Sequence, residues 1–357
     1  MTQLVLYIIV GILLFGLLIA VHEGGHFLTA KLLGVQVNEF AIGMGPAIFS
    51  RQREETKYSL RAFPVGGYCA MEGEDEETGN PRSFSSKSPW RKVIILAAGS
   101  VMNFVAGFVL VAILFASSGG YTVPVIRDFM DGFPCAGQEG LLPGDRILSV
   151  NGHKVHIYSE LTAQLNAAAG SQTMDLVVER EGEKVVLDDL PLTMREYTVD
   201  GQTVTMYGIY FTVEEPSFTG LLEQSWYTCW YFAKAVWSGL VMLVSGQVGL
   251  NDMSGPVGIV SYVGEVGSQG GSIAAGLQNV CYLIALIAVN LAIMNLLPIP
   301  ALDGGRIFLL IVGELWFLFF GKKIPPKYEA WIHGVGFSLL ILLMVVVTFS
   351  DIWKLVK

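Results

Sequence analysis

The chain has 357 residues, of which 52% are hydrophobic and only 15% are charged, and its mean hydropathy is +0.54. Soluble domains carry about 25% charged residues, so this composition indicates a membrane protein. The net charge of -9 at pH 7 argues against nucleic acid as a partner, because a basic surface that could neutralise phosphates is missing.

Four uncharged apolar runs are each long enough to cross about 30 Å of hydrocarbon as a helix. They cover residues 4–21, 93–117, 273–302 and 330–350, and the last of them contains His333. The sequence therefore predicts a polytopic α-helical membrane protein with about four transmembrane helices in the lipid bilayer.

The basic residues predict how these helices are oriented. Residues 31–92 contain nine lysines and arginines, whereas the longer segment of residues 119–216 contains six. Short loops that are rich in basic residues stay in the cytoplasm. We therefore expect a bacterial inner or plasma membrane protein whose first loop is cytoplasmic and whose residues 119–272 are extracytoplasmic.

Between the spans, strand and turn patterns predict two β-rich parts. In the first loop, the alternating stretch of residues 58–63 is followed by Pro64 and a Gly-Gly pair, which predicts a β-hairpin. In residues 119–216, short β-rich stretches separated by Asn-Gly and Glu-Gly turns predict a small inserted domain. The aromatic residues of the segment 218–248 favour a helix at the membrane interface.

These patterns divide the chain into four parts. Residues 1–118 hold the first two spans and the hairpin, and residues 119–216 form the inserted domain. Residues 217–272 hold the interfacial helix and a GPVGI segment, and residues 273–357 hold the last spans. The acidic run of residues 72–77 in the first loop is typical of a solvated loop.

The motif His22-Glu23-x-x-His26 stands at the end of the first apolar run. On a helix the two histidines lie one turn apart on one face, where both can bind one zinc ion, with Glu23 beside the open position. There the carboxylate can take a proton from water and deliver it to a leaving amine. Gly24 and Gly25 disfavour a helix, so we expect another backbone to pack against them.

Catalytic zinc usually has three protein ligands, and Asp303 is the best candidate for the third. It follows the third apolar run in a segment that contains Asn295, Pro298 and Pro300. The prolines end the helix, and broken backbone at membrane depth is tolerated where it is buried or lines a cavity. Taken alone, Asp303 could instead simply end a membrane helix at the interface.

Together these motifs resemble the site-2 protease family of intramembrane zinc metalloproteases, peptidase family M50, in its bacterial RseP-like branch. The resemblance rests on HExxH in the first span and on three further segments. These are residues 63–68 (FPVGGY), 255–259 (GPVGI) and 295–304 (NLLPIPALDG). Residues 140–152 are similar to the core of a bacterial PDZ domain, so the inserted domain is expected to be one PDZ domain.

The resemblance implies hydrolysis of peptide bonds in transmembrane segments of single-span proteins, such as anti-sigma factors, and in remnant signal peptides. It implies one zinc ion held by His22, His26 and Asp303, with Glu23 as the general base. The active site is then expected towards the cytoplasmic side and the PDZ domain outside.

The resemblance also implies where substrates bind. The strand of residues 58–63, with Tyr58 and Leu60, would present the substrate as an added strand, and Asn295 would hold the substrate backbone. PDZ domains bind extended peptides at a sheet edge, so peptide termini are expected near Gly140.

Two other classes of protein share parts of this pattern. A membrane-anchored zincin that cuts outside the bilayer would take its third ligand from a soluble helix, and no second Glu-rich helix is evident. A catalytically inactive PDZ adaptor would have a broken ligand set, whereas all three candidate ligands are present here. A transporter is disfavoured because four spans show no internal repeat.

Overall fold

The computed structural model describes residues 2–74, 78–199, 201–249, 252–322 and 324–356. The chain divides into two compact units, one of Met1–Val111 with Phe232–Lys357 and one of Ala112–Tyr231. Both boundaries fall inside helices, α2 (Pro89–Ser117) and α4 (Phe218–Val244). The helix expected after the inserted domain is thus present as α4, and its place at the membrane interface stays a prediction.

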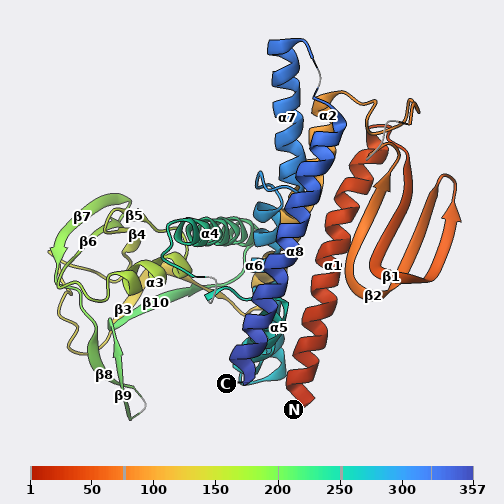
Figure 1. Cartoon of the computed structure of the whole chain (residues 1–357). Helices are drawn as coiled ribbons and strands as arrows, with labels where there is room; N and C mark the ends of the chain where they lie inside the picture. The colour runs from red at the N-terminus through yellow and green to blue at the C-terminus, as the bar shows by residue number, and fades with distance from the viewer. Residues whose placement is uncertain (1, 75–77, 200, 250–251, 323, 357) are drawn as a thin grey trace. The chain divides into compact units, whose positions relative to one another are not determined.

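Most of the first unit is helical (Figure 1). Besides α2 and the end of α4, it contains α1 (Thr2–Leu32), α5 (Pro256–Ser268), α6 (Ile273–Met294), α7 (Asp303–Phe320) and α8 (Pro326–Val356). Within the described residues, α1, α2, α6 and α8 are long and apolar enough to cross a membrane. The prediction of a polytopic α-helical protein with four spans is confirmed.

The third span ends earlier than the apolar run suggested. Helix α6 begins after Ser272, whose side chain accepts a hydrogen bond from the backbone N–H of Ala275, and it ends at Met294 rather than at residue 302. Pro298 and Pro300 lie in the loop that follows, because proline cannot donate to the helical ladder. Asp303 then begins helix α7, so it starts a helix instead of ending one.

Small residues let α5 pack closely against α1. A Cβ atom on Gly11 of α1 would lie 2.6 Å from a methyl carbon of Val263, and one on Gly267 would lie 2.5 Å from the ring of Tyr7. The Tyr7 side chain is buried. Such close backbones supply the van der Waals contact that holds membrane helices together. Helix α5 therefore fixes the first half of α1.

Helix α8 contacts the start of α5 through a buried carboxylate. Asp351 lies near the end of α8 and is only 3% exposed. It accepts a hydrogen bond of 2.8 Å from the backbone N–H of Gly258. The first N–H groups of a helix have no partner within the helix, so this carboxylate satisfies one of them and interacts favourably with the helix dipole.

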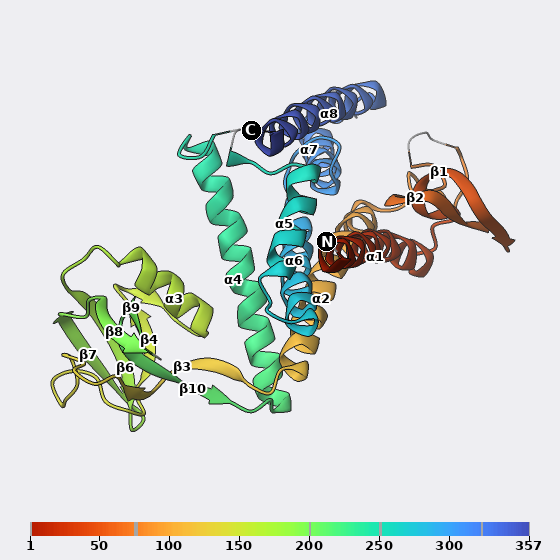
Figure 2. The ribbon, with the colours of Figure 1, turned by 90° about the horizontal axis from the view of Figure 1, so that it is seen from below.

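A β-hairpin is present in the first loop, as expected, but its turn lies at residues 54–55 and not at the predicted break of residues 64–67. Strands β1 (Val37–Arg53) and β2 (Thr56–Met71) pair antiparallel, and contacts with α1 place the sheet beside that helix (Figure 2). Residues 39–42 pair on one side with residues 57–60 and on the other with residues 67–70. Residues 57–60 also pair with residues 49–52. The segments therefore follow the order 49–52, 57–60, 39–42, 67–70.

The second unit contains the β-rich domain expected from the sequence. Its sheet has the strand order β10-β3-β4-β6-β7, with β5 paired to β4, and the strands β8 and β9 form a separate hairpin. The bounds are β3 (Tyr121–Phe129), β4 (Arg146–Val150), β5 (His153–Lys154), β6 (Met174–Arg180), β7 (Glu183–Leu190), β8 (Arg195–Val199), β9 (Gln202–Met206) and β10 (Ile209–Glu214). Helix α3 (Tyr158–Ala167) packs into the same core, and this arrangement is consistent with a PDZ-like insert.

One arginine holds the loop that begins at Gly140. Arg180 at the end of β6 donates two hydrogen bonds of 2.8 Å to the carboxylate of Asp145, which is 1% exposed. The same guanidinium donates to the carbonyl oxygen of Gly140, and Asp145 accepts from the backbone N–H of Leu142. Bidentate pairs of this kind fix geometry as well as adding energy, so the loop 140–145 is held against the sheet.

Replacing Arg180 by alanine leaves a buried carboxylate without its cation, and we expect a loss of about 3 kcal/mol in the stability of the inserted domain. Hydrogen exchange of the full-length protein measures this loss. Protection of the buried amides in β4 and β6 should fall by roughly 100-fold. Arg195→Ala, at an exposed arginine of the same domain, should leave protection within about threefold. Equal protection in Arg180→Ala and the wild type would contradict the expected role of this pair.

Candidate metal centre

Helix α1 runs without a break through the HExxH motif. His22 and His26 lie one turn apart, as the spacing predicts, and their Nε2 atoms are 3.3 Å apart. The ring planes meet at 86°. Both Nε2 atoms therefore face the same point beside α1.

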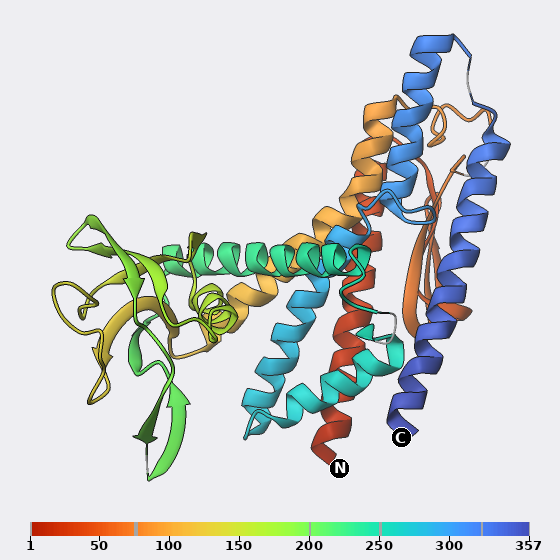
Figure 3. The ribbon, with the colours of Figure 1, turned by 60° about the vertical axis from the view of Figure 1, so that its left-hand side comes forward.

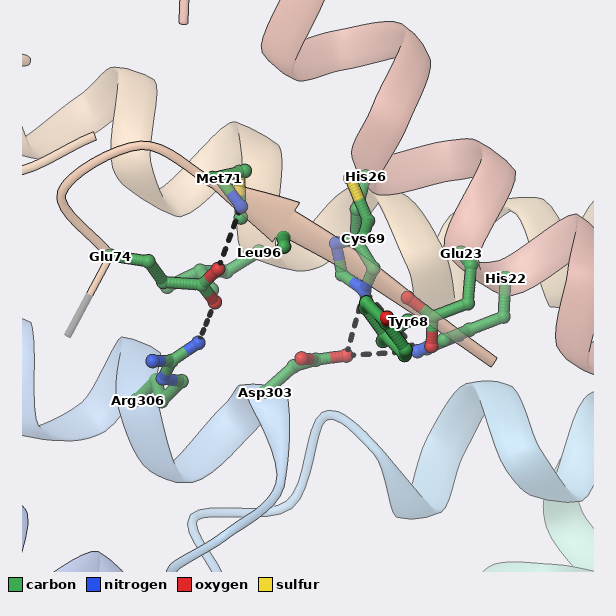
Figure 4. A pocket seen from close by; sticks show the side chains of 11 residues that line it. His22, Glu23, His26, Tyr68, Cys69, Met71, Glu74, Leu96, Asp303 and Arg306 are labelled. Carbon is green, nitrogen blue, oxygen red and sulfur yellow. Dashed lines mark hydrogen bonds and ion pairs between the residues drawn. The ribbon is translucent and has the colours of Figure 1, made fainter. Parts of the chain in front are cut away.

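Asp303, the first residue of α7, brings a carboxylate to this point (Figure 4). Its Oδ2 atom lies 3.2 Å from Nε2 of His22 and 3.4 Å from Nε2 of His26. The start of α7 places it there, because the backbone N–H of Gly304 donates to the carbonyl oxygen of Asn295 over 2.7 Å and so closes the loop between α6 and α7.

The three ligand atoms fit zinc. Zinc bonds of 2.0–2.2 Å at tetrahedral angles place neighbouring ligand atoms about 3.3–3.6 Å apart, close to the three distances here. Two imidazoles and one carboxylate are also typical zinc ligands. Oδ2 of Asp303 is buried and makes no hydrogen bond to any described residue. A metal ion would satisfy this buried oxygen.

The other ring nitrogen of each histidine is held by α2. Nδ1 of His26 lies 2.8 Å from the carbonyl oxygen of Ile95 and donates to it when Nε2 binds metal. Nδ1 of His22 lies 3.3 Å from the side-chain amide of Asn103, which is buried. An amide group can be turned to exchange its oxygen and nitrogen, and Oδ1 is the Asn103 atom that can accept a hydrogen bond from Nδ1–H of His22. These contacts leave both Nε2 atoms for the metal.

Two glycines make room for this arrangement. A Cβ atom on Gly25 would lie 2.5 Å from the carbonyl oxygen of Ala98, so the expected close backbone is present there. A Cβ atom on Gly24 would have nothing within 4 Å, so the expectation is wrong for this residue. On α2, a Cβ atom on Gly99 would lie 2.5 Å from Nε2 of His26. The imidazoles therefore pack directly on the backbone of α2.

Glu23 lies on the same cavity as the three ligands. The cavity measures about 430 Å³ and is lined by residues from α1, α2, α7 and the hairpin. Its lining residues are His22, Glu23, His26, Tyr68, Cys69, Ala70, Met71, Glu74, Leu96, Asp303 and Arg306. Burial raises the pKa of the Cys69 thiol to about 12, and the charges of Glu23 and Glu74 add to this shift. Cys69 is therefore a neutral thiol beside the carboxylates.

The structure places the predicted substrate residues of the hairpin away from this cavity. Tyr58 and Leu60 belong to residues 57–60, which pair on both sides within the sheet, and neither lines the cavity. The segment that does line it is residues 68–71. In the described part of the chain, residues 67–71 pair on one side only, with residues 37–42.

Asn295 and Gly140 lie in different units. Asn295 follows α6, and its side-chain nitrogen lies 3.5 Å from Nε2 of His22, so the structure brings it to the candidate metal centre. Gly140 belongs to the second unit, in the loop held by Arg180.

Several residues at this site were missed by the sequence reasoning. Arg306 follows Asp303 by one turn of α7 and forms an ion pair with Glu74 of the first loop. For Glu74 the expectation of a solvated loop is wrong, because the residue lines the cavity, whereas residues 75–77 lie outside the described part of the chain. Asn103 was recognisable as an amide inside an apolar span, where polar groups need partners.

Gly99→Ala should weaken zinc binding by at least about tenfold, because its methyl group would overlap both imidazoles. Alanine favours a helix over glycine by about 1 kcal/mol, so a loss of zinc affinity would come from the overlap and not from a weaker helix. Zinc affinity of the purified protein, measured by competition with a chelator, tests the expectation. The matched change Gly24→Ala meets no neighbour and should keep wild-type affinity. Equal affinities for both variants would show that Gly99 is not required.

Comparison with known proteins relates the chain to zinc metalloproteases. The chain is 35% identical to a protein of Clostridium acetobutylicum described as a candidate zinc metalloprotease, over 97% of each chain. A protein of Clostridium perfringens with the same description is also 35% identical, over 97% of this chain and 98% of its own. The regulator of sigma-W protease RasP of Bacillus subtilis is 29% identical over 98% of both chains.

A protein-family model also matches most of the chain. The model described as "Peptidase family M50" matches residues 10–343, which include the HExxH motif, the inserted domain and Asp303. The resemblance seen in the sequence motifs is thereby confirmed over most of the chain. The chain belongs to peptidase family M50.

Proposed function

We propose that His22, His26 and Asp303 hold the zinc ion of this intramembrane metalloprotease of the site-2 type, and that Glu23 is its general base. The observation that carries the proposal is the triangle of three ligand atoms, drawn from α1 and α7, that shares one cavity with the Glu23 carboxylate. A protein of this family with an intact ligand set is expected to be active, not an adaptor.

The chain's own residues perform the proton transfers of peptide hydrolysis. Bound zinc supplies a Lewis acid that activates a water molecule and polarises the scissile carbonyl. The Glu23 carboxylate takes one proton from the attacking water, and the water oxygen forms a new bond to the carbonyl carbon. Glu23 then delivers that proton to the amide nitrogen as the C–N bond breaks, which yields a carboxylic acid, with the second water proton still on its hydroxyl group, and an amine.

Residues 68–71 are the better candidate for the strand that holds the substrate. They line the cavity and have an edge without a paired strand among the described residues. A substrate helix hides its carbonyl groups in hydrogen bonds, whereas an added strand exposes alternate carbonyls to the centre. The proposed role of Asn295 is to donate from its amide to the substrate backbone, and its position 3.5 Å from Nε2 of His22 supports this role. Tyr58 and Leu60 would then support this edge from within the sheet.

The proposed substrates are single-span membrane proteins, such as anti-sigma factors, and remnant signal peptides. The name of the RasP protease of Bacillus subtilis, a regulator of sigma-W, supports this class. Four helices long enough to span a membrane make the chain a multi-pass membrane protein.

We place the centre towards the cytoplasmic side and the inserted domain outside the cytoplasm. His22 stands about 30 Å along α1 from its first residue, the full thickness of the hydrocarbon core. The basic first loop next to it supports a cytoplasmic location. In the inserted domain, the loop that begins at Gly140 would bind peptide termini.

Glu23→Gln should abolish cleavage while the protein keeps its zinc, because the amide cannot take a proton and the three ligands remain. General base catalysis contributes at least about 100-fold to the rate. A proteomic comparison of membranes from cells that express the wild type or Glu23→Gln should show single-span stubs and signal-peptide remnants accumulating with the variant. The stubs would name the substrates.

Asp303→Asn is the matched variant for the ligand set. It should lose activity together with zinc, whereas Glu23→Gln should lose activity alone. Indistinguishable membranes for wild type and Glu23→Gln under several stresses would contradict the proposed protease and favour a PDZ adaptor. Full zinc retention in Asp303→Asn would contradict the proposed third ligand.

A further inference from the structure

Helix α8 carries one ionisable residue in the whole stretch of residues 330–350, and this is His333. An ionisable side chain within a transmembrane segment is costly, and such residues mark functional positions by default. His333 is too far along the chain from other metal-ligand candidates to form a metal motif in the sequence. Its position in the fold gives it a different partner.

His333 contacts the loop that carries the third zinc ligand. The backbone N–H of Ala301 donates a hydrogen bond of 3.0 Å to Nδ1 of His333. Ala301 stands two residues before Asp303, in the loop between α6 and α7 that reaches α8 (Figure 3). The contact therefore acts on the backbone that determines where the Asp303 carboxylate lies.

The backbone at this point needs an external support. Ala301 has a φ of +74°, a left-handed conformation that costs a non-glycine residue of order 1 kcal/mol or more. Such conformations persist where the surroundings over-determine them. One turn further along α8, a Cβ atom on Gly336 would overlap the ring of Pro300. Helix α8 therefore touches two consecutive loop residues, one through a hydrogen bond and one through close packing.

We infer that His333 is a positioning residue for the metal centre: its Nδ1 atom holds Ala301 in the conformation that brings Asp303 to His22 and His26. The inference rests on the proposed metal ligands and adds α8 to the parts that assemble them. Loss of the acceptor leaves the Ala301 N–H without this bond, and the loop can relax towards an ordinary φ. The carboxylate of Asp303 then no longer meets both imidazoles at once.

Asparagine and glutamine at position 333 can distinguish a need for an acceptor at the Nδ1 position from a need for any polar side chain. Asparagine places Oδ1 where histidine has Nδ1, one bond beyond Cγ, so His333→Asn retains the acceptor. Glutamine carries its oxygen one bond further out, and leucine has no acceptor. All three side chains fit the space of a histidine without adding a charge to the span.

The test is the zinc affinity of the full-length protein in detergent, measured by chelator competition, together with the melting temperature of the zinc-free protein. His333→Gln and His333→Leu should bind zinc at least about tenfold more weakly, and His333→Asn should stay within about threefold of the wild type. The melting temperatures of the zinc-free variants should match that of Phe337→Leu, a change at an exposed residue of the same helix. The kcat of the zinc-loaded Gln and Leu variants should also fall, with KM little changed.

Wild-type zinc affinity in His333→Gln and His333→Leu would overturn the inference, and so would an equal loss in His333→Asn and His333→Gln. A loss of affinity that only follows a lower melting temperature of the zinc-free protein would overturn it too. Asp303→Asn distinguishes these results from failure of the proposed metal centre. If that variant binds zinc like the wild type, the ligand set itself is wrong and the inference falls with it.

Discussion

The close approach of α1 and α2 is the constraint on which the metal centre depends. Gly25 meets the backbone at Ala98, and Gly99 leaves space for both imidazoles. Because the α2 backbone lies directly behind the rings, the carbonyl oxygen of Ile95 can hold His26 without any intervening side chain. The orientation of the rings therefore depends on the packing of the helices, because a methyl group at Gly25 or Gly99 would separate the helices or turn the rings. The contacts between α1 and α2 thus orient both imidazoles independently of α7.

Helix α8 is mostly exposed along its length. Two of its polar residues nevertheless hold other segments of the unit by hydrogen bonds. His333 meets the loop before Asp303, and Asp351 meets the N–H of Gly258 at the start of α5. Helix α5 in turn packs against α1, which carries the HExxH motif. An apolar helix that faces mostly outward therefore supports both ligand-bearing helices through single hydrogen bonds. In lipid, where water cannot compete for backbone groups, each such bond is hard to replace.

Local patterns were sufficient to predict the spans, the presence of a hairpin in the first loop, the β-rich insert and the one-turn spacing of His22 and His26, but they placed the turn of the hairpin at residues 64–67 and not at residues 54–55. They could not show where the third span ends, because the loop of residues 295–302 that follows α6 is itself uncharged and mostly apolar. The sequence also did not predict that the hairpin folds back on itself, because the alternation of apolar and polar residues does not show which segments pair on both sides. The ion pair between Glu74 and Arg306 joins residues that are 232 positions apart, beyond the reach of a local charge pattern.

The proposed ligand set joins α1 to α7, and residues 33–302 lie between these two helices. A metal ion bound by residues of both helices would act as a cross-link that closes this long loop. The entropy that such a cross-link removes from the unfolded chain grows only slowly with loop length. The inserted domain lies entirely inside this loop, entered through α2 and left through α4. The domain can therefore accept insertions at almost no cost to the closure, because added length changes the closure entropy so little.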